Sequence, residues 1–214
     1  MVASGQVGRG GRRAGTRGVP RPVREQRILD VAGQAFSERG YHAASMEQIA
    51  RRAGVTKPVV YAYFASKEGL YAAYIEREGS ELIERMRAAT DVADEPAERL
   101  RAGTVEFLRF VAERRDGWQL LYAEAAARGG PLAERIVELR ARIVRMVRRV
   151  LEQQSLDGRA TANEAAFDAL AHAFVGAGES LANWWLTRPD VSAQDVTELL
   201  LASGRATVER ALAA

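Results

Sequence analysis

The residues best suited to chemistry in this chain are a lysine and two tyrosines that lie close together, Lys57, Tyr61 and Tyr63. An ammonium group and phenolic hydroxyls on one short segment can contact phosphate oxygens and the polar edges of bases. The segment follows Thr56 and Pro58, which are typical of a helix start. An exposed helix of this kind is suited to a major groove of DNA.

A first short helix and a turn are expected to position that segment. Ser45 and Gln48 have the form of a capping box, in which a hydroxyl and an amide satisfy the first free N–H groups of a helix. A buried stripe follows at three-to-four spacing, formed by Ile49, Ala50 and Ala53. Gly54 ends the helix, because glycine adopts a left-handed backbone at little cost.

The second helix is expected to span about residues 57–64. Thr56 is an N-cap, and Pro58 fits only the first turn, where its missing N–H is not needed. Val60 and Phe64 share the face turned back toward the first helix. The side chains left to point outward or sideways are Lys57, Val59, Tyr61 and Tyr63. Together the two segments predict a helix-turn-helix.

The motifs of residues 24–75 stand in a fixed order, beginning with A-F-S-E-R-G-Y at 35–41 and S-M-E-Q-I-A at 45–50, followed by A-G-V-T-K at 53–57, Y-A-Y-F at 61–64 and S-K-E-G-L at 66–70. This order resembles the tetracycline-repressor (TetR) family of bacterial transcriptional regulators. The resemblance implies that DNA is contacted by Ser45, Thr56, Lys57, Val59, Tyr61, Tyr63 and Lys67. Tyr63 departs from the histidine of many members but keeps an aromatic ring that can hydrogen-bond a phosphate.

Charge is distributed unevenly along the chain. Residues 1–67 hold 12 Lys and Arg against 4 Asp and Glu, or +8, so the remainder carries −5 within a total of +3. A basic front directs that part of the chain to a polyanion. Residues 1–23 are rich in Gly and Arg and are expected to form a disordered basic arm, which either tracks phosphates or is an inert tail.

The remainder, residues 68–214, is predicted to be all-α and to form a ligand-binding and dimerisation domain after the DNA-binding domain at 24–67. Helices are expected at about 66–89, 96–115, 117–127, 131–154, 162–186 and 193–212, with breaks at Gly129-Gly130-Pro131 and Asp157-Gly158. With three N-terminal helices this makes about nine, as the family resemblance implies.

The last two helices carry apolar stripes that are interpreted as the interface of a homodimer. The residues concerned are Phe167, Leu170, Phe174, Ala177, Leu181, Trp184, Leu199, Leu200, Ser203 and Thr207. Their alternating spacing of three and four is typical of helix pairs, and the resemblance implies a four-helix bundle between subunits. The alternative is that these stripes fill the core of one subunit.

Aromatic and amphipathic residues of the central helices are candidates for an effector pocket that takes a largely apolar small molecule. They are Phe107, Phe110, Trp118, Tyr122, Met146, His172 and Trp185. For each aromatic the alternative is ordinary core packing. The arginine-rich helix from Arg135 to Arg149 is interpreted as a solvated outer face, with a second nucleic-acid surface as the alternative.

Catalysis finds little support. The chain has no cysteine and two histidines in different segments, His42 and His172, and no cluster has metal-ligand spacing. We therefore expect no enzyme activity, no metal and no cofactor. No apolar run is long enough to span a bilayer, which predicts a cytoplasmic protein. The hypothesis is a ligand-released homodimeric repressor; the alternative is an architectural DNA-binding protein or an activator without a ligand.

Overall fold

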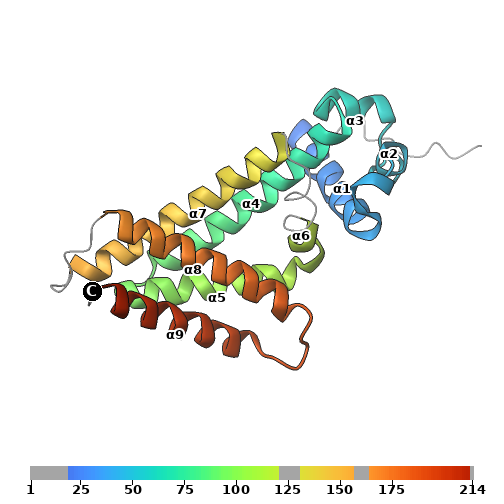
Figure 1. Cartoon of the computed structure of the whole chain (residues 1–214). Coiled ribbons are helices and arrows are strands. Elements are labelled where there is room, and N and C mark those ends of the chain that lie inside the picture. The colour runs from blue at the N-terminus through green and yellow to red at the C-terminus, as the bar shows by residue number, and fades with distance from the viewer. Residues whose placement is uncertain (1–18, 121–130, 157–163, 213–214) are drawn as a thin grey trace, which may run out of the picture. The chain divides into compact units, whose positions relative to one another are not determined.

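The computed structural model describes residues 19–120, 131–156 and 164–212. Within these ranges the backbone forms nine helices and no strand (Figure 1). The described residues therefore confirm the all-α fold. They divide into two compact units, an N-terminal unit that ends at Leu70 and a C-terminal unit that begins at Tyr71. The boundary falls within helix α4 (Lys67–Asp91), and the predicted arm at residues 1–23 lies mostly outside the described residues.

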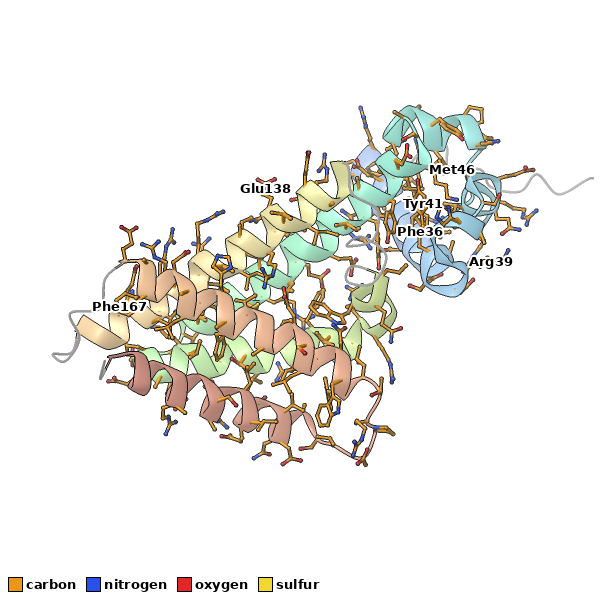
Figure 2. The ribbon with its side chains drawn as sticks, in the orientation of Figure 1. Phe36, Arg39, Tyr41, Met46, Glu138 and Phe167 are labelled. Carbon is orange, nitrogen blue, oxygen red and sulfur yellow. The ribbon has the colours of Figure 1, made fainter. Side chains whose placement is uncertain are left out.

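The N-terminal unit contains α1 (Arg21–Ala43), α2 (Met46–Ala53) and α3 (Lys57–Phe64). The core side chain of α1 is Phe36, which is fully buried and whose ring centroid lies 6.0 Å from that of Tyr41 (Figure 2). Gly40 leaves helical geometry at φ 72° and ψ 165°, which allows the chain to bend before Tyr41. The stripe predicted for α2 is confirmed, because Ile49, Ala50 and Ala53 are all buried.

The turn between α2 and α3 has the predicted form. Gly54 adopts φ 73° and ψ 26°, and its N–H donates to the carbonyl of Arg51. This left-handed conformation carries no steric cost for glycine. Val60 and Phe64 are buried on the inner face of α3, as expected from their four-residue spacing.

The capping of these helices differs from the prediction. Ser45 and Thr56 occupy the N-cap positions of α2 and α3, but neither side chain makes a capping hydrogen bond. The predicted capping-box hydrogen bonds are therefore wrong. The side-chain amide oxygen of Gln48 instead accepts from the Arg39 guanidinium at 2.8 Å. Ser66 does cap α4, since its hydroxyl accepts from the Gly69 N–H at 2.9 Å.

The C-terminal unit consists of the greater part of α4, followed by α5 (Pro96–Glu113), α6 (Arg115–Gln119), α7 (Pro131–Leu156), α8 (Glu164–Trp185) and α9 (Ala193–Leu212). These bounds confirm the predicted helices to within a few residues. The exception is α6, whose described part is short, because residues 121–130 lie outside the described ranges. Among the described helices, none combines the length and apolar character required to cross a membrane.

Helix α8 packs against α7 and α9, and α5 packs against α7 and α9 (Figure 1). Two apolar clusters fill the space between them. One is built around Phe107, Phe110 and Trp118, and the other around Val147, Phe167 and Leu170. Burial of these aromatic and aliphatic side chains is the main favourable contribution to folding of this unit.

One charged side chain of α4 is fully buried in the C-terminal unit. The Glu78 carboxylate accepts from the Arg77 guanidinium at 2.8 Å, and its second oxygen lies 3.6 Å from Arg114 Nη1. Burial raises the pKa of the Tyr74 hydroxyl well above its ordinary value, and the negative charge of Glu78 raises it further. The buried tyrosine therefore stays neutral in the folded protein.

The raised pKa of Tyr74 predicts an alkaline loss of stability. Below the ordinary tyrosine value of 10.0 both states hold the proton, so there is no effect. Above it the unfolded chain releases the proton while the folded protein retains it, which favours unfolding by about 1.4 kcal/mol at about pH 11. Denaturant unfolding at pH 8 and 11 measures this loss, and Tyr74→Phe should reduce it. An identical loss in wild type and variant would contradict the assignment to Tyr74.

Candidate nucleic-acid interface and effector cavity

The exposed face of α3 brings together two of the residues predicted to contact DNA. Lys57 and Tyr61 are both exposed, and the Lys57 ammonium lies 6.0 Å from the centre of the Tyr61 ring. They stand one helical turn apart, because residues four positions apart share a helix face. Thr56 is exposed beside them at the N-terminus of the helix, where free backbone N–H groups favour an anion. This face therefore offers a cation, a phenol and a hydroxyl to phosphate oxygens.

Tyr63 lies apart from this face and is held by α1. Its hydroxyl accepts from Arg24 Nη1 at 3.4 Å, and the Arg21 guanidinium lies 5.3 Å from its ring centre. Sequence reasoning missed Arg21 and Arg24 as partners of α3. The signal available was their position in the first turn of α1 within the basic front of the chain.

The remaining predicted DNA contacts are less exposed. Ser45 and Val59 are half-buried. Lys67 donates to the backbone carbonyl of His42 at 2.9 Å, and its ammonium lies 4.8 Å from the centre of the Tyr41 ring. The structure thus uses Lys67 to join the first turn of α4 to the end of α1.

Charged side chains also join α1 to α2. Arg52 donates to both carboxylate oxygens of Glu38, at 3.0 and 3.2 Å, and to Gln34 at 3.1 Å. This pairing lowers the pKa of Glu38 below its ordinary value. Bidentate pairs of this geometry hold two helices in one orientation. Arg52 therefore contributes to the orientation of the helix-turn-helix.

The central helices enclose an apolar cavity of about 90 Å³, which we call the central cavity. It lies between α4, α5, α7, α8 and α9. Its lining is largely aliphatic and aromatic and includes Leu82, Met86, Phe107, Trp118, Ile136, Leu139, Ile143, Val147, Phe174, Val175 and Leu200. Gly79 of α4 lies close to Leu139 of α7, since a Cβ built on Gly79 would meet the Leu139 side chain at 2.5 Å.

The predicted ligand residues divide between this cavity and other places. Phe107 and Trp118 line it with their rings at right angles, 5.3 Å apart. Phe110 is fully buried in the core, and the Trp185 indole donates to the Val191 carbonyl at 2.8 Å. Met146 lines two neighbouring cavities instead. Tyr122 lies outside the described residues.

His172 is not among the residues that line the central cavity. Its imidazole is half exposed, 3.8 Å from Asp168 one turn earlier on α8. The alternative of core packing is therefore wrong for His172, whereas its assignment to a ligand pocket stays a prediction.

An ion pair at the central cavity was missed by sequence reasoning. Arg140 Nε donates to both oxygens of Glu179 at 3.0 Å, and both residues contribute to the lining. Glu179 is buried, at 8% exposure. The signal was available, since Glu179 is the single Asp, Glu, Lys or Arg between Asp168 and Arg188. A buried carboxylate paired with a half-buried guanidinium in an apolar lining offers one polar anchor to a ligand.

The residues predicted to form a dimer interface do not all lie on the surface. Phe167, Leu170 and Leu200 are buried within the chain, so they have little surface left for a second subunit. Trp184 and Leu199 are exposed at 41% and 50%. Leu181 and Phe174 are half-buried and pack against the two clusters. Ala177 is half-buried and Ser203 exposed, whereas the side chain of Thr207 is outside those described.

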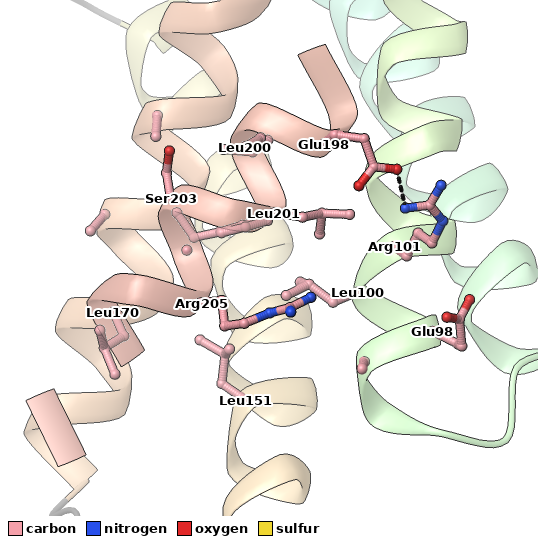
Figure 3. Close-up of a pocket in the computed structure, with 15 residues that line it drawn as sticks. Glu98, Leu100, Arg101, Leu151, Leu170, Glu198, Leu200, Leu201, Ser203 and Arg205 are labelled. Atoms are coloured by element: carbon pink, nitrogen blue, oxygen red, sulfur yellow. Dashed lines mark hydrogen bonds and ion pairs between the residues drawn. The ribbon is translucent and has the colours of Figure 1, made fainter. Parts of the chain in front are cut away.

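Several of these residues line a groove of about 380 Å³ between α5, α7, α8 and α9 (Figure 3). Its lining includes the apolar side chains of Leu151 and Leu170 and the hydroxyl group of Ser203. An ion pair between Arg101 of α5 and Glu198 of α9, 2.5 Å long, crosses the gap between these helices (Figure 3). The surface of α8 and α9 is therefore mixed in character, with apolar residues beside a charged groove.

We find no candidate metal site in the described part of the chain. There, no group of three or more His, Cys, Asp or Glu side chains could hold a metal ion.

Comparison with known proteins agrees with this geometry. The sequence profile of "Bacterial regulatory proteins, tetR family" matches residues 28–74, and that of "Tetracyclin repressor-like, C-terminal domain" matches residues 96–206. A TetR-like transcriptional regulator from Rhodococcus sp. RHA1 is 34% identical over 91% of this chain and 98% of that one, with a TM-score of 0.71.

Two further relatives are informative. The HTH-type transcriptional activator FasR of Mycolicibacterium smegmatis is 41% identical over 113 residues, or 53% of this chain and 51% of FasR. The match thus spans about half the length of this curated relative. The structure of AibR with isovaleryl coenzyme A and operator DNA has a TM-score of 0.67 at 21% identity, over 84% of this chain and 97% of AibR. From the two profiles and the Rhodococcus structure, the chain belongs to the TetR family of transcriptional regulators.

Proposed function

We propose that this regulator binds a pseudo-palindromic operator as a homodimer and is released from it by a small, largely apolar effector. The observation that carries the DNA-binding part is the exposed pair of Lys57 and Tyr61 on α3, opposite the buried Val60 and Phe64. In a two-fold dimer, two such helices would enter successive major grooves about 34 Å apart.

The proposed dimer uses the exposed residues of α8 and α9. Trp184 and Leu199 are large apolar side chains that a monomer would leave in water. The Trp184 ring is covered in part by the Arg188 guanidinium, 5.5 Å from the ring centre. A second copy of this surface, related by two-fold symmetry, would bury both side chains and would match the symmetry of a palindromic operator.

The proposed effector site is the central cavity. Its lining is largely apolar with one ion pair, Arg140 with the buried Glu179, which is the composition of many small-molecule sites. AibR, which shares the fold, was solved with an acyl-CoA and operator DNA, so acyl thioesters are suitable first ligands to test. An effector reverses DNA binding only if it prefers the DNA-incompetent conformation, by about 5.5 kcal/mol for a full reversal.

Activation of transcription is the second candidate. FasR, 41% identical over its matched segment, is an activator. DNA contact by α3 would be the same in both cases, and the position of the operator relative to the promoter would decide the outcome. A reporter gene under the control of the selected operator distinguishes a repressor from an activator.

We expect Lys57→Ala to weaken operator binding about tenfold at physiological salt. The reason is that each subunit loses one phosphate contact, so the slope of log affinity against log salt should fall by about two. Operator DNA is first selected from a random pool, and affinity is then measured by fluorescence anisotropy at several salt concentrations. Sedimentation of the same samples shows whether the protein and its variants are dimers.

Lys67→Ala is the matched control. Lys67 already binds the His42 carbonyl, so we expect its removal to change the salt slope less than removal of Lys57. An unchanged slope for Lys57→Ala would refute the proposed contact face. A monomer at micromolar concentration that still binds the full operator would refute the dimer.

A further inference from the structure

Five arginines line one cavity of the C-terminal unit, which we call the arginine mouth; its volume is about 680 Å³. Three of them follow one another on α7 at spacings of three and four residues and therefore share one face of the helix. The other two come from the end of α4 and the first turns of α5. The five are Arg87, Arg99, Arg142, Arg145 and Arg149. Asp91 is the single acidic residue among the described residues that line the mouth.

The positive charge of the mouth is only partly neutralised. Arg87 lies 3.5 Å from Asp91, and Arg142 lies 3.5 Å from Glu76. Arg145 and Arg149 are exposed, and neither forms an ion pair with the residues that the structure describes. This part of α7 is therefore more than a solvated outer face, because two arginines that form no ion pair with the described residues line one hollow of net positive charge.

A third cavity of about 20 Å³, which we call the passage, shares lining residues with both the mouth and the central cavity. It shares Met86, Thr104, Val147 and Phe174 with the central cavity. It shares Thr90, Arg99, Met146 and Val150 with the mouth. The apolar central cavity and the cationic mouth are therefore neighbours on either side of the passage.

The apolar central cavity is small, and the cationic mouth is large. The central cavity, at about 90 Å³, is smaller than the roughly 300–1,000 Å³ of sites for drug-sized ligands. The mouth is within that range. A short apolar group fits the inner end, whereas the outer end has room for a bulky anionic group. Guanidinium groups bind phosphate oxygens in pairs, which makes an arginine cluster a phosphate site more than a carboxylate site.

We propose that the arginine mouth binds the phosphate groups of an effector whose short acyl chain enters the central cavity. The ligand class is an acyl ester or thioester of a phosphorylated carrier. This inference rests on the proposed function only in taking the central cavity as the effector site. Arg145 and Arg149 are the phosphate-binding residues of the mouth, and Arg99 lies where the mouth meets the passage.

Calorimetric titration of the full chain with three probes tests this inference. Butyryl-CoA carries both parts of the ligand, CoA carries the phosphates alone, and butyrate carries the chain alone. Wild-type protein should bind butyryl-CoA most tightly, CoA less tightly and butyrate weakest. The double variant R145Q/R149Q should weaken binding of butyryl-CoA and CoA about tenfold, since it removes two charge-assisted contacts.

The control is R109Q/R135Q, which makes the same change of charge on α5 and α7. Arg109 and Arg135 are exposed and lie outside the mouth, so binding should stay within about twofold. Wild-type affinity in R145Q/R149Q, or no binding of either CoA probe by wild type, overturns the inference. Equal affinities for CoA and butyryl-CoA, both lost in the variant, identify a site for free phosphorylated compounds and overturn its connection with the cavity.

Measuring operator affinity in the absence of ligand distinguishes failure of this inference from failure of the proposed function. A protein that binds operator but no CoA probe retains the DNA-binding function and loses the arginine-mouth ligand. A protein that binds butyryl-CoA in the mouth but has no operator affinity retains the ligand site and loses the proposed function.

Discussion

Replacing Phe36 with alanine is expected to destabilise the N-terminal unit by about 3–5 kcal/mol, the usual cost of truncating a buried phenylalanine. Phe36 is fully buried and stacks on Tyr41 at 6.0 Å. Folded domains have a free energy of unfolding of about 5–15 kcal/mol. A small three-helix unit would therefore lose most of its free energy of unfolding. Operator binding should then be lost at 37 °C, because α3 is no longer held. Chemical denaturation and fluorescence anisotropy measure the two effects.

The control for this prediction is Val23→Ala on the same helix. Val23 is 56% exposed, and its truncation should change stability by less than about 0.5 kcal/mol. Phe36→Leu, which keeps more of the buried volume, should fall between the two. Sedimentation should show that Phe36→Ala is still a dimer, since the proposed interface lies in α8 and α9. Operator affinity unchanged by Phe36→Ala would contradict this account of the N-terminal core.

Arg77→Ala is expected to lower the free energy of unfolding by about 3 kcal/mol, because it leaves the Glu78 carboxylate buried without its closest cation. Glu78 has no exposed surface, and Arg77 supplies its hydrogen bonds at 2.8 and 3.2 Å. Arg114 remains 3.6 Å away, which places the cost at the lower end of the range for broken buried pairs. Urea unfolding at neutral pH measures this difference.

The double variant Arg77→Ala/Glu78→Gln distinguishes a charge effect from lost packing. If the cost arises from an unpaired carboxylate, then neutralising that side chain should recover part of it. Arg109→Ala is the surface control, because Arg109 is exposed and pairs with Glu106 at 3.1 Å, a contact worth at most about 1 kcal/mol. A double variant less stable than Arg77→Ala would show that the charge of Glu78 is not the cause.

Local sequence signals predicted the elements of the fold well. The bounds of α3 follow from Thr56, Pro58 and the spacing of Val60 and Phe64, and the structure has the same bounds. Gly54 marked the turn for a reason that does not depend on the rest of the chain, since only its own backbone conformation is involved. Helix periodicity and helix-breaking residues are local properties, so they can be read in sequence order.

Side-chain partners could not be predicted in this way. The capping box at Ser45 failed because Gln48 is bound by Arg39, which precedes it by nine residues on another helix. The sequence also did not indicate that Lys67 donates to the carbonyl of His42, 25 residues earlier. The partner of each side chain depends on which helices pack together and at what angle. The sequence of a single segment does not contain that information.

The partners of the apolar stripes on α8 and α9 could not be predicted from the sequence either. Periodicity identified Phe167, Leu170 and Leu200 as residues that must be covered, but it could not say whether α7 or a second subunit covers them. In the structure they are buried within one chain, whereas Trp184 and Leu199 are left exposed. Apolar surface is covered equally well by either partner, so the hydrophobic pattern alone does not distinguish them.

The sequence by itself determined the helix-turn-helix, the helical remainder and the family, because caps, turns and periodicity act over a few residues. It also left Lys57, Val59, Tyr61 and Tyr63 to point outward or sideways, and the structure exposes Lys57 and Tyr61. Only the tertiary structure decided that Arg140 pairs with Glu179 at the central cavity, and that arginines of α4, α5 and α7 meet at one opening. Both arrangements join residues from separate helices, and the packing of those helices alone determines which side chains meet.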